Sequence, residues 1–254
     1  MESSIGTSSF SWYIAKIPNR IRKRAPWAAA AASALACAMA QQSASAGYPA
    51  HWWTPVSAQT APAWEILPQA AKSGEVILSK RNELGILSNF AATPFTLRGK
   101  RYASVEGFWQ MMLYPEGPAD PRAKASGIVW PHTREEVAGM TAFEAKDAGT
   151  AAEENMRKMG IDWVTFEGKR IRYRSKTRGD HYRLILEAMR AKLEQNPQVR
   201  QILLSTGDLI LRPDHIEEPD PPAEWLYFKI WMDIRTEWDR PPGRSARREA
   251  RSVN

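Results

Sequence analysis

Residues 180–195 carry the clearest structural signal in this chain, a row of apolar side chains at the spacing of an amphipathic α-helix. The pair Asn196-Pro197 then ends the pattern. A second helix is predicted over residues 105–114, with Ser104 as its N-cap. Because each helix must bury its apolar face, the two need a shared core. The apolar positions are Tyr182, Ile185, Leu186, Met189 and Leu193 in the first helix and Val105, Phe108, Trp109 and Met112 in the second.

Three sequences of the form Thr-x-x-Glu lie between these helices, and each has the pattern of a capping box. Each is predicted to begin a short helix, with Gly149 and Gly160 as the residues that end helices. A final amphipathic helix is predicted over residues 225–238. The three capping patterns are Thr133 to Glu136, Thr141 to Glu144 and Thr150 to Glu153.

The strand candidates are few and short. Residues 75–78 and 209–211 are two of them, and residues 94–97 and 101–102 flank a turn as a hairpin. Because helices outnumber these strands, the expected fold class is α+β, a single compact and mainly helical domain over residues 75–238. Residues 47–74, rich in Trp and Pro, are predicted to be an irregular arm whose tryptophans are packing anchors.

The formal net charge of +7 does not describe this central domain. Residues 1–46 hold five basic and one acidic residue and residues 239–254 hold five and two, so residues 47–238 carry 25 of each sign. Nucleic-acid binders usually carry a net positive footprint. Any polyanion binding by the neutral domain must therefore come from a local cluster.

The number and spacing of the cysteine and histidine residues, and the absence of several motifs, exclude several kinds of site. A lone Cys37 cannot form an internal disulfide or a CxxC pair. The four histidines lack HExxH or HxxxH spacing, and no P-loop, GxGxxG or GxSxG sequence occurs. The sequence therefore predicts neither a bound metal nor a cofactor.

Residues 1–46 contain the features of a processed leader in their usual order. Basic residues at 20–24 precede an alanine-rich run over 25–40, and Ala44-Ser45-Ala46 supplies an AxA-type cleavage site. The run is too short and too weakly apolar for stable membrane insertion. Export to the periplasm is one interpretation. The alternatives are an organelle transit peptide or a mis-called start on a cytoplasmic protein. Residues 239–254 are predicted to be a disordered basic tail.

Glu106 is the candidate catalytic residue. It lies in the first turn of the helix over 105–114, at the edge of the apolar face, where unpaired backbone amides favour an anion. Gln110 lies one turn further on the same side. A carboxylate fixed beside Trp109 could activate water or stabilise a cationic transition state. The alternative is a first-turn glutamate that only complements the helix dipole.

Several sequence blocks in a fixed order resemble the NADAR family of YbiA-like proteins. The resemblance covers about residues 75–236, nearly the whole predicted domain. It implies a compact, mainly helical α+β fold and N-glycosidase activity, in which the bond between a ribose anomeric carbon and a nitrogen is hydrolysed. The blocks are Leu87-Ser88-Asn89-Phe90, Pro94-Phe95, Gly99-Lys100-Arg101-Tyr102, Ser104-Val105-Glu106-x-x-x-Gln110, Asp162-Trp163, Lys192-Leu193-x-Gln195-Asn196 and Leu203-Leu204-x-Thr206-Gly207.

This resemblance implies roles for individual residues. Glu106 matches the family's catalytic glutamate, Asn89 and Gln110 match its polar pocket wall, and Trp163 matches a pocket tryptophan. A carboxylate suits this reaction because cleavage passes through an oxocarbenium-like ribose. Asn89 could bond ribose hydroxyls and Trp163 could stack on the base, although Trp163 could equally be a core residue. The implied partners are a small nucleotide or an ADP-ribosyl group, including one attached to nucleic acid.

The chain also departs from the family pattern. Gly107 and Leu113 stand where the best-known members have His and Lys, and the late glycine-rich D-x-x-W-G block is replaced by residues 217–225. Trp225 is retained without the glycines that let a backbone approach a pyrophosphate closely. Asp220 and Glu224 are candidates for a second carboxylate.

Five basic residues alternate over 170–178. If this segment is extended, all five lie on one face and could pair with phosphates, with Arg172 and Arg174 as the main candidates. The alternative is a solvated basic face. Two function classes stay open, namely an N-ribosyl hydrolase and a non-catalytic nucleotide-binding or envelope interaction module on the same fold. The five are Arg170, Arg172, Arg174, Lys176 and Arg178.

Overall fold

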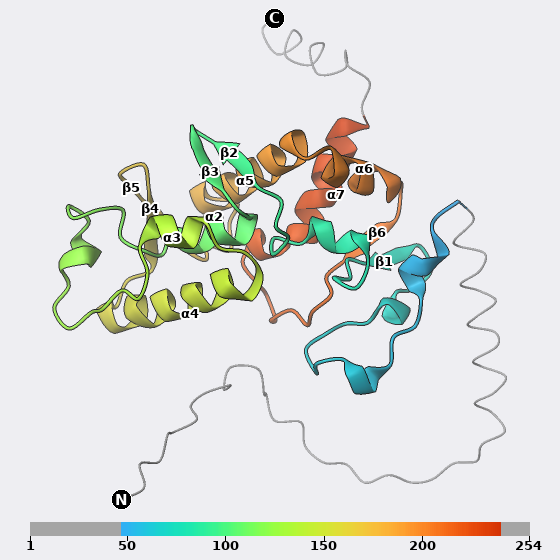
Figure 1. Ribbon diagram of the computed structural model, residues 1–254, viewed down its shortest axis with the longest axis horizontal. Helices are drawn as coiled ribbons and strands as arrows, with labels where there is room; N and C mark the ends of the chain where they lie inside the picture. The colour runs from blue at the N-terminus through green and yellow to red at the C-terminus, as the bar shows by residue number, and fades with distance from the viewer. Residues whose placement is uncertain (1–46, 240–254) are drawn as a thin grey trace, which may run out of the picture. The chain divides into compact units, whose positions relative to one another are not determined.

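A computed structural model describes residues 47–239 (Figure 1). The predicted leader, Cys37 and all but the first residue of the predicted basic tail lie outside the described residues. The helices are α2 (Val105–Met111), α3 (Arg134–Ala138), α4 (Ala142–Met159), α5 (Asp180–Gln195), α6 (Pro197–Ser205) and α7 (Tyr227–Trp238). The strands are β1 (Glu75–Ile77), β2 (Phe95–Leu97), β3 (Lys100–Tyr102), β4 (Trp163–Phe166), β5 (Lys169–Arg172) and β6 (Ile210–Arg212).

The strands of the described region form three separate pairs. β1 pairs in parallel with β6, with Glu75 opposite Ile210, while β2–β3 and β4–β5 are antiparallel hairpins. Helices hold most of the regular structure, so the α+β, mainly helical class predicted from the sequence is confirmed. No helix among residues 47–239 is both long and apolar enough to cross a membrane.

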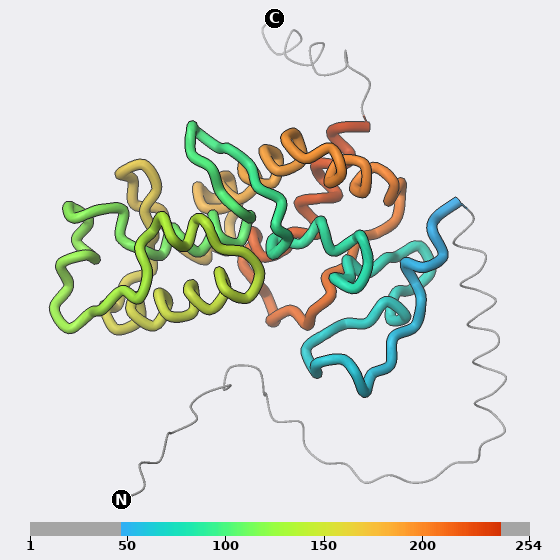
Figure 2. Tube along the Cα trace, in the orientation of Figure 1, coloured from blue at the N-terminus to red at the C-terminus, as the bar shows by residue number. Residues whose placement is uncertain are grey.

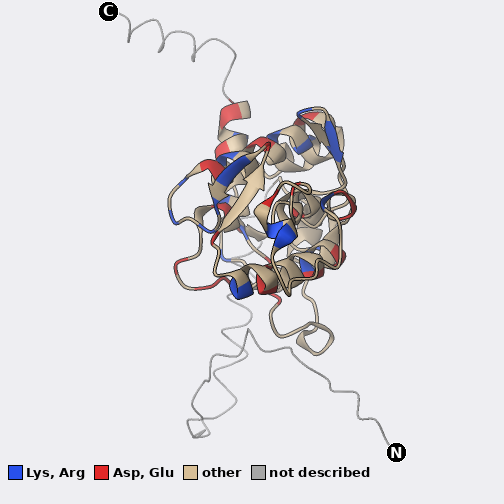
Figure 3. Cartoon of the chain, turned by 90° about the vertical axis from the view of Figure 1, so that its left-hand side faces the viewer, with Lys and Arg blue, Asp and Glu red and all other residues tan. Residues whose placement is uncertain are grey.

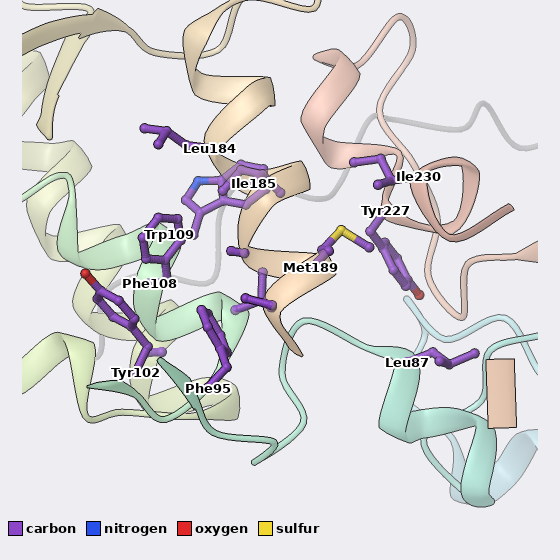
Figure 4. Packing of buried hydrophobic residues seen from close by; sticks show 14 of the residues in the cluster. Leu87, Phe95, Tyr102, Phe108, Trp109, Leu184, Ile185, Met189, Tyr227 and Ile230 are labelled. Carbon is purple, nitrogen blue, oxygen red and sulfur yellow. The ribbon is translucent and has the colours of Figure 1, made fainter. Parts of the chain in front are cut away.

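The short helix α2 lies at the centre of the core. All seven of its residues are buried, and it packs against α3, α4 and α5 (Figures 1 and 2). Around Phe108 and Trp109 the core contains aromatic rings from the β2–β3 hairpin and aliphatic side chains from α5, as Figure 4 shows for Phe95, Tyr102 and Ile185. A helix enclosed in this way is held in place by tertiary packing, because seven residues are too few for an isolated helix.

Most local signals in the sequence gave the right element. Ser104 caps α2 by accepting a hydrogen bond from the Gly107 amide at 2.9 Å, and Thr133 and Glu136 form a complete capping box. Gly160 ends α4 in the left-handed conformation, with φ of 65°. Helix α5 has the predicted bounds. In the arm, the 3-10 turn Ala50–Trp53 carries Trp52, which is 1% exposed and donates to Glu83 at 2.7 Å.

Three local predictions were wrong. Thr141 precedes α4 as its N-cap but makes no side-chain capping hydrogen bond, so the capping box predicted there does not form. Thr150 to Glu153 does not begin a helix and Gly149 does not end one, because α4 runs unbroken through both. The last helix begins at Tyr227, after a 3-10 turn over Ala223–Trp225. Of the two alternatives for the basic segment, the extended five-residue ribbon does not form, because β5 ends at Arg172 and Arg174 has a left-handed φ of 55°.

Candidate functional site

Glu106 is held by contacts on both sides of the α2 N-terminus. Its backbone amide donates to the Asn89 carbonyl at 2.9 Å, and the Ser104 hydroxyl before it donates to the Met140 carbonyl at 2.9 Å. The Glu106 side chain is 6% exposed, and its Oε1 accepts a hydrogen bond from Gln110 Nε2 at 2.8 Å. The sequence-predicted pairing of Glu106 with Gln110 one turn away is thus present.

Burial raises the pKa of the Glu106 carboxyl above its ordinary value. The hydrogen bond from Gln110 and the positive charges of Lys146 and Lys80 oppose this rise, while the negative charge of Glu153 adds to it. The net pKa is raised. A carboxyl whose pKa moves toward neutrality is suited to exchanging protons at physiological pH.

The segment Leu87-Ser88-Asn89 is fixed by three donors from three helices. Trp231 Nε1 of α7 donates to the Leu87 carbonyl at 2.7 Å, Lys192 Nζ of α5 donates to the Ser88 carbonyl at 2.8 Å, and the Glu106 amide of α2 donates to the Asn89 carbonyl. Three successive carbonyls are therefore satisfied by elements far apart in sequence. The Asn89 side-chain Oδ1 is buried without a partner among the described residues. An orphaned acceptor beside Glu106 is suited to a ligand hydroxyl.

Lys192 should make the stability of the protein increase with pH in the alkaline range. Its ammonium is 0% exposed, and burial lowers its pKa to about 7. An unfolded lysine keeps its proton to a pKa of about 10.4. Folding therefore releases a proton between these values, and the free energy of unfolding should rise by about 1.4 kcal/mol per pH unit above pH 7. Urea unfolding between pH 7 and 9.5 would measure this slope, and Lys192→Met should flatten it. An equal slope in both proteins would contradict the assignment.

Gly149 of α4 provides the space for the Gln110 side chain. A Cβ at Gly149 would lie 1.8 Å from Gln110 Oε1, which is itself buried without a partner. The glycine predicted to end a helix instead permits close contact between α4 and α2. Gly107 has a comparable role, because a Cβ there would lie 2.5 Å from the Met140 carbonyl oxygen. Position 107 thus lies where no side chain fits.

Gly149→Ala should destabilise the protein by about 1–3 kcal/mol, because the methyl group displaces the Gln110 side chain in a packed core. In an unobstructed helix the same change would stabilise by up to about 1 kcal/mol. Urea unfolding of Gly149→Ala, Gln110→Ala and the double variant separates the two effects. With Gln110 truncated, the alanine at 149 should become neutral or stabilising. A destabilisation that persists in the double variant would show that another contact opposes the methyl group.

A second buried carboxylate is Glu224, which pairs with His181. Their Oε1 and Nδ1 atoms lie 2.8 Å apart, and the two side chains are 0% and 1% exposed. The His181 ring packs edge-on against Trp109 and Tyr173, with ring centres 5.0 and 5.1 Å apart. Glu224 Oε2 and His181 Nε2 have no partner among the described residues. The pair joins the replaced late loop to the start of α5.

Two other sequence candidates lie elsewhere. Asp220 is exposed at the surface and pairs with Lys176, so the buried carboxylate of the late loop is Glu224. Trp163 lies on β4, and the guanidinium groups of Arg122 and Arg170 lie 5.0 and 4.3 Å from the centre of its ring. None of the side-chain contacts described here joins Trp163 to Glu106.

Arg172 and Arg174 line one surface pocket of about 410 Å³. Arg172 is largely exposed and lies 3.7 Å from Asp162. Arg174 binds Glu153 at 2.6 Å and lies over the Trp225 ring, 5.0 Å from its centre. Figure 3 shows basic and acidic segments interspersed on the side of the molecule that it presents. The basic segment is therefore partly neutralised and not a continuous cationic face.

Glu153 is the site residue that sequence reasoning missed. It accepts hydrogen bonds from Tyr173 at 2.9 Å and from Arg174, and its charge acts on Glu106. The sequence pattern predicts a capping box for Glu153 because it follows Thr150 by three residues. Glu153 lies four residues after Gly149, so on a continuous helix it lies on the same side of the helix as Gly149. That spacing is the sequence signal that places Glu153 near the site. No group of three or more His, Cys, Asp or Glu in residues 47–239 could hold a metal ion.

Comparison with known proteins gives one structural neighbour. No protein-family profile and no curated protein matches the chain. Its structure is similar to the NMR structure of the E. coli protein YbiA, with 20% sequence identity and a TM-score of 0.41. The match covers 73% of this chain and 93% of YbiA.

Proposed function

We propose that this protein hydrolyses an N-ribosyl bond and that Glu106 is its catalytic carboxylate. The observation that carries the proposal is the environment of that carboxyl group. It is buried, has a raised pKa, is oriented by Gln110 and lies next to the segment that carries the unpartnered Asn89 Oδ1. The resemblance of the sequence blocks to an N-glycosidase family supports the same reaction.

The chemistry needs a base near the ribose anomeric carbon. As the C1–N bond breaks, its electron pair stays with nitrogen and C1 acquires oxocarbenium character. The Glu106 carboxylate takes a proton from a water molecule whose oxygen bonds to C1. The leaving nitrogen takes a proton from solvent, and Glu106 then returns its proton to solvent. The raised pKa makes Glu106 a stronger base than an exposed glutamate. Asn89 Oδ1 would accept a hydrogen bond from a ribose hydroxyl.

The proposed substrate is a small nucleotide or an ADP-ribosyl group, which includes one carried by a modified nucleic acid. Either is anionic, and Arg172 and Arg174 offer guanidinium groups for phosphate at one pocket. We further propose that the leader over residues 1–46 exports the protein. Finding the intact leader on cytosolic protein would contradict export and favour a mis-called start.

A product assay tests the proposed reaction. The full chain would be incubated separately with NAD, with DNA carrying ADP-ribosylated guanine, and with a ribosylamino-pyrimidine phosphate. Mass spectrometry would follow the released base and the ribose product. Release from one substrate, absent in Glu106→Gln, is the expected result. Failure to release a base from any of the three, with binding still seen by thermal shift, would refute the hydrolase.

A non-catalytic nucleotide-binding module is the second candidate function. It is favoured by one observation, which is that Glu106 is not among the residues lining the pocket of Arg172 and Arg174. A binder needs only that pocket, whereas a hydrolase also needs substrate to reach a side chain that is 6% exposed. The product assay separates the two functions.

A further inference from the structure

One face of α4 carries a row of side chains that runs alongside the candidate site. Phe143, Lys146, Thr150 and Glu153 follow one another at intervals of three or four residues, which places them in a row along the helix. Ten residues of α-helix span about 15 Å. Figures 1 and 2 show α4 lying beside α2, the helix that carries Glu106. The row therefore connects three chemically different groups.

The first group is aromatic and open to solvent. Phe143 is 54% exposed, although its ring packs edge-on against Phe90 and Trp64, with ring centres 5.3 and 6.3 Å apart. Trp64 is itself 36% exposed, unlike Trp52, the buried anchor of the same arm. Lys80 Nζ lies 5.4 Å from the centre of the Phe90 ring. Exposed rings grouped in this way suit the face of a planar base.

The second group is the Glu106 carboxyl with its supports. Asn89 directly precedes Phe90, and the Phe90 carbonyl accepts the Ala142 amide of α4 at 3.1 Å. Gln110 contacts α4 at Gly149, halfway along the row, and the charge of Lys146 acts on Glu106. Glu106 thus lies between the aromatic end of the row and Glu153.

The third group is cationic. Glu153 at the end of the row holds Arg174, whose ring contact with Trp225 fixes the guanidinium. Only Arg174 Nη2 donates a hydrogen bond to a described residue, which leaves most of the five N–H donors of the guanidinium for a ligand. Among residues 47–239, the ionic contact of the Arg172 side chain is the exposed one with Asp162 at 3.7 Å.

From this order we infer that the substrate is a nucleotide laid along α4 in a defined direction. Its planar base stacks on the aromatic cluster of Trp64, Phe90 and Phe143, its ribose lies at Glu106, and its phosphate binds Arg172 and Arg174. This inference rests on the proposed function, because it takes Glu106 as the point at which the N-ribosyl bond lies. It assigns a ligand role to Trp64 and Phe143, which the sequence did not single out.

Binding of ligand fragments tests this direction. Isothermal titration calorimetry on the full chain would use AMP, UMP, adenosine and ribose 5-phosphate as probes. Phe143→Leu keeps the apolar bulk but removes the π-face, so it should weaken AMP and adenosine about tenfold and leave ribose 5-phosphate unchanged. Phe143→Tyr should retain binding. The double variant Arg172→Ala/Arg174→Ala should weaken AMP and ribose 5-phosphate and leave adenosine unchanged.

The controls distinguish the loss of a ligand contact from a loss of folding. Trp238→Ala removes another exposed ring, which lies on α7, and should change no affinity. Thermal unfolding of every variant reports whether the fold is retained, and Trp64→Ala repeats the test from the arm. The inference is overturned if Phe143→Leu and Trp64→Ala affect all probes equally or none, or if neither nucleotide binds the unaltered protein. Turnover by the wild type and its loss in Glu106→Gln are measured separately, so they can hold while this inference fails.

Discussion

Arg122→Ala is expected to cost about 3–5 kcal/mol of the free energy of unfolding, because it leaves a buried carboxylate without its partner. The Arg122 side chain is 1% exposed and binds Asp120, which is 3% exposed, at 2.7 Å. Burial raises the pKa of Asp120, but the hydrogen bonds from Arg122 and from backbone amides outweigh it and hold the pKa well below its ordinary value. Asp120 is therefore charged in the fold.

Arg122 also donates hydrogen bonds to the backbone carbonyls that follow the helix carrying Glu106. Its Nη1 donates to the carbonyls of Met112 and Leu113 at 3.1 and 3.0 Å, and its Nη2 donates to that of Tyr114 at 3.0 Å. These carbonyls belong to the three residues that directly follow α2, where no further helical turn can satisfy them. Truncating Arg122 thus removes a helix cap and an ion pair together.

Urea unfolding at pH 7 measures the effect of Arg122→Ala. Arg183→Ala is the matched control, since its ion pair with Asp180 is exposed on both sides and should contribute little. The double variant Arg122→Met/Asp120→Asn removes both charges and should be less damaging than Arg122→Ala alone. A loss below about 1 kcal/mol in Arg122→Ala would mean that water replaces the guanidinium and that α2 does not depend on it.

The sequence predicted those parts of the site that depend on local geometry. Ser104, Glu106 and Gln110 belong to one short helix and its cap, so their spacing alone placed them together. The partners of Ser88 and Glu224 could not be predicted in this way. Lys192 reaches Ser88 across 104 residues and His181 reaches Glu224 across 43, and no short pattern encodes such contacts. Only the packing of α5 and α7 against the loops brings them together.

The wrong predictions from the sequence also have a common physical cause. Gly149 and Thr150 have the residue types of a helix stop and a helix start, yet α4 continues because Gln110 packs where a side chain would otherwise lie. Tertiary packing overrode a local preference of about 1 kcal/mol. The same error concealed Glu153, which became visible as a site residue only when α4 was seen to be continuous. Arg174 left the predicted ribbon because its contacts with Glu153 and Trp225 hold it in a left-handed conformation.

Glu106→Gln is expected to lower kcat/KM by about 10²–10⁴-fold and at the same time to stabilise the fold. The amide keeps the shape of the side chain and can still accept the hydrogen bond from Gln110. The folded pKa of Glu106 is raised, so its contribution to stability is fully present below the ordinary pKa of glutamate, near 4.3, and is lost as pH rises through the folded value. Above the ordinary glutamate pKa, folding must therefore either bury the charge of the carboxylate or take up a proton, and the neutral amide removes this cost.

Kinetics and urea unfolding of the same two proteins distinguish a catalytic Glu106 from a structural one. In the wild type, kcat/KM should rise with pH through a value above the ordinary glutamate range, since only the carboxylate can take a proton from water. Glu135→Gln, an exposed first-turn change in α3, is the control and should alter neither property. If Glu106 only complemented the helix dipole, its amide variant would lose stability and keep its activity. A stable and inactive Glu106→Gln protein is the result that a carboxylate kept for catalysis requires.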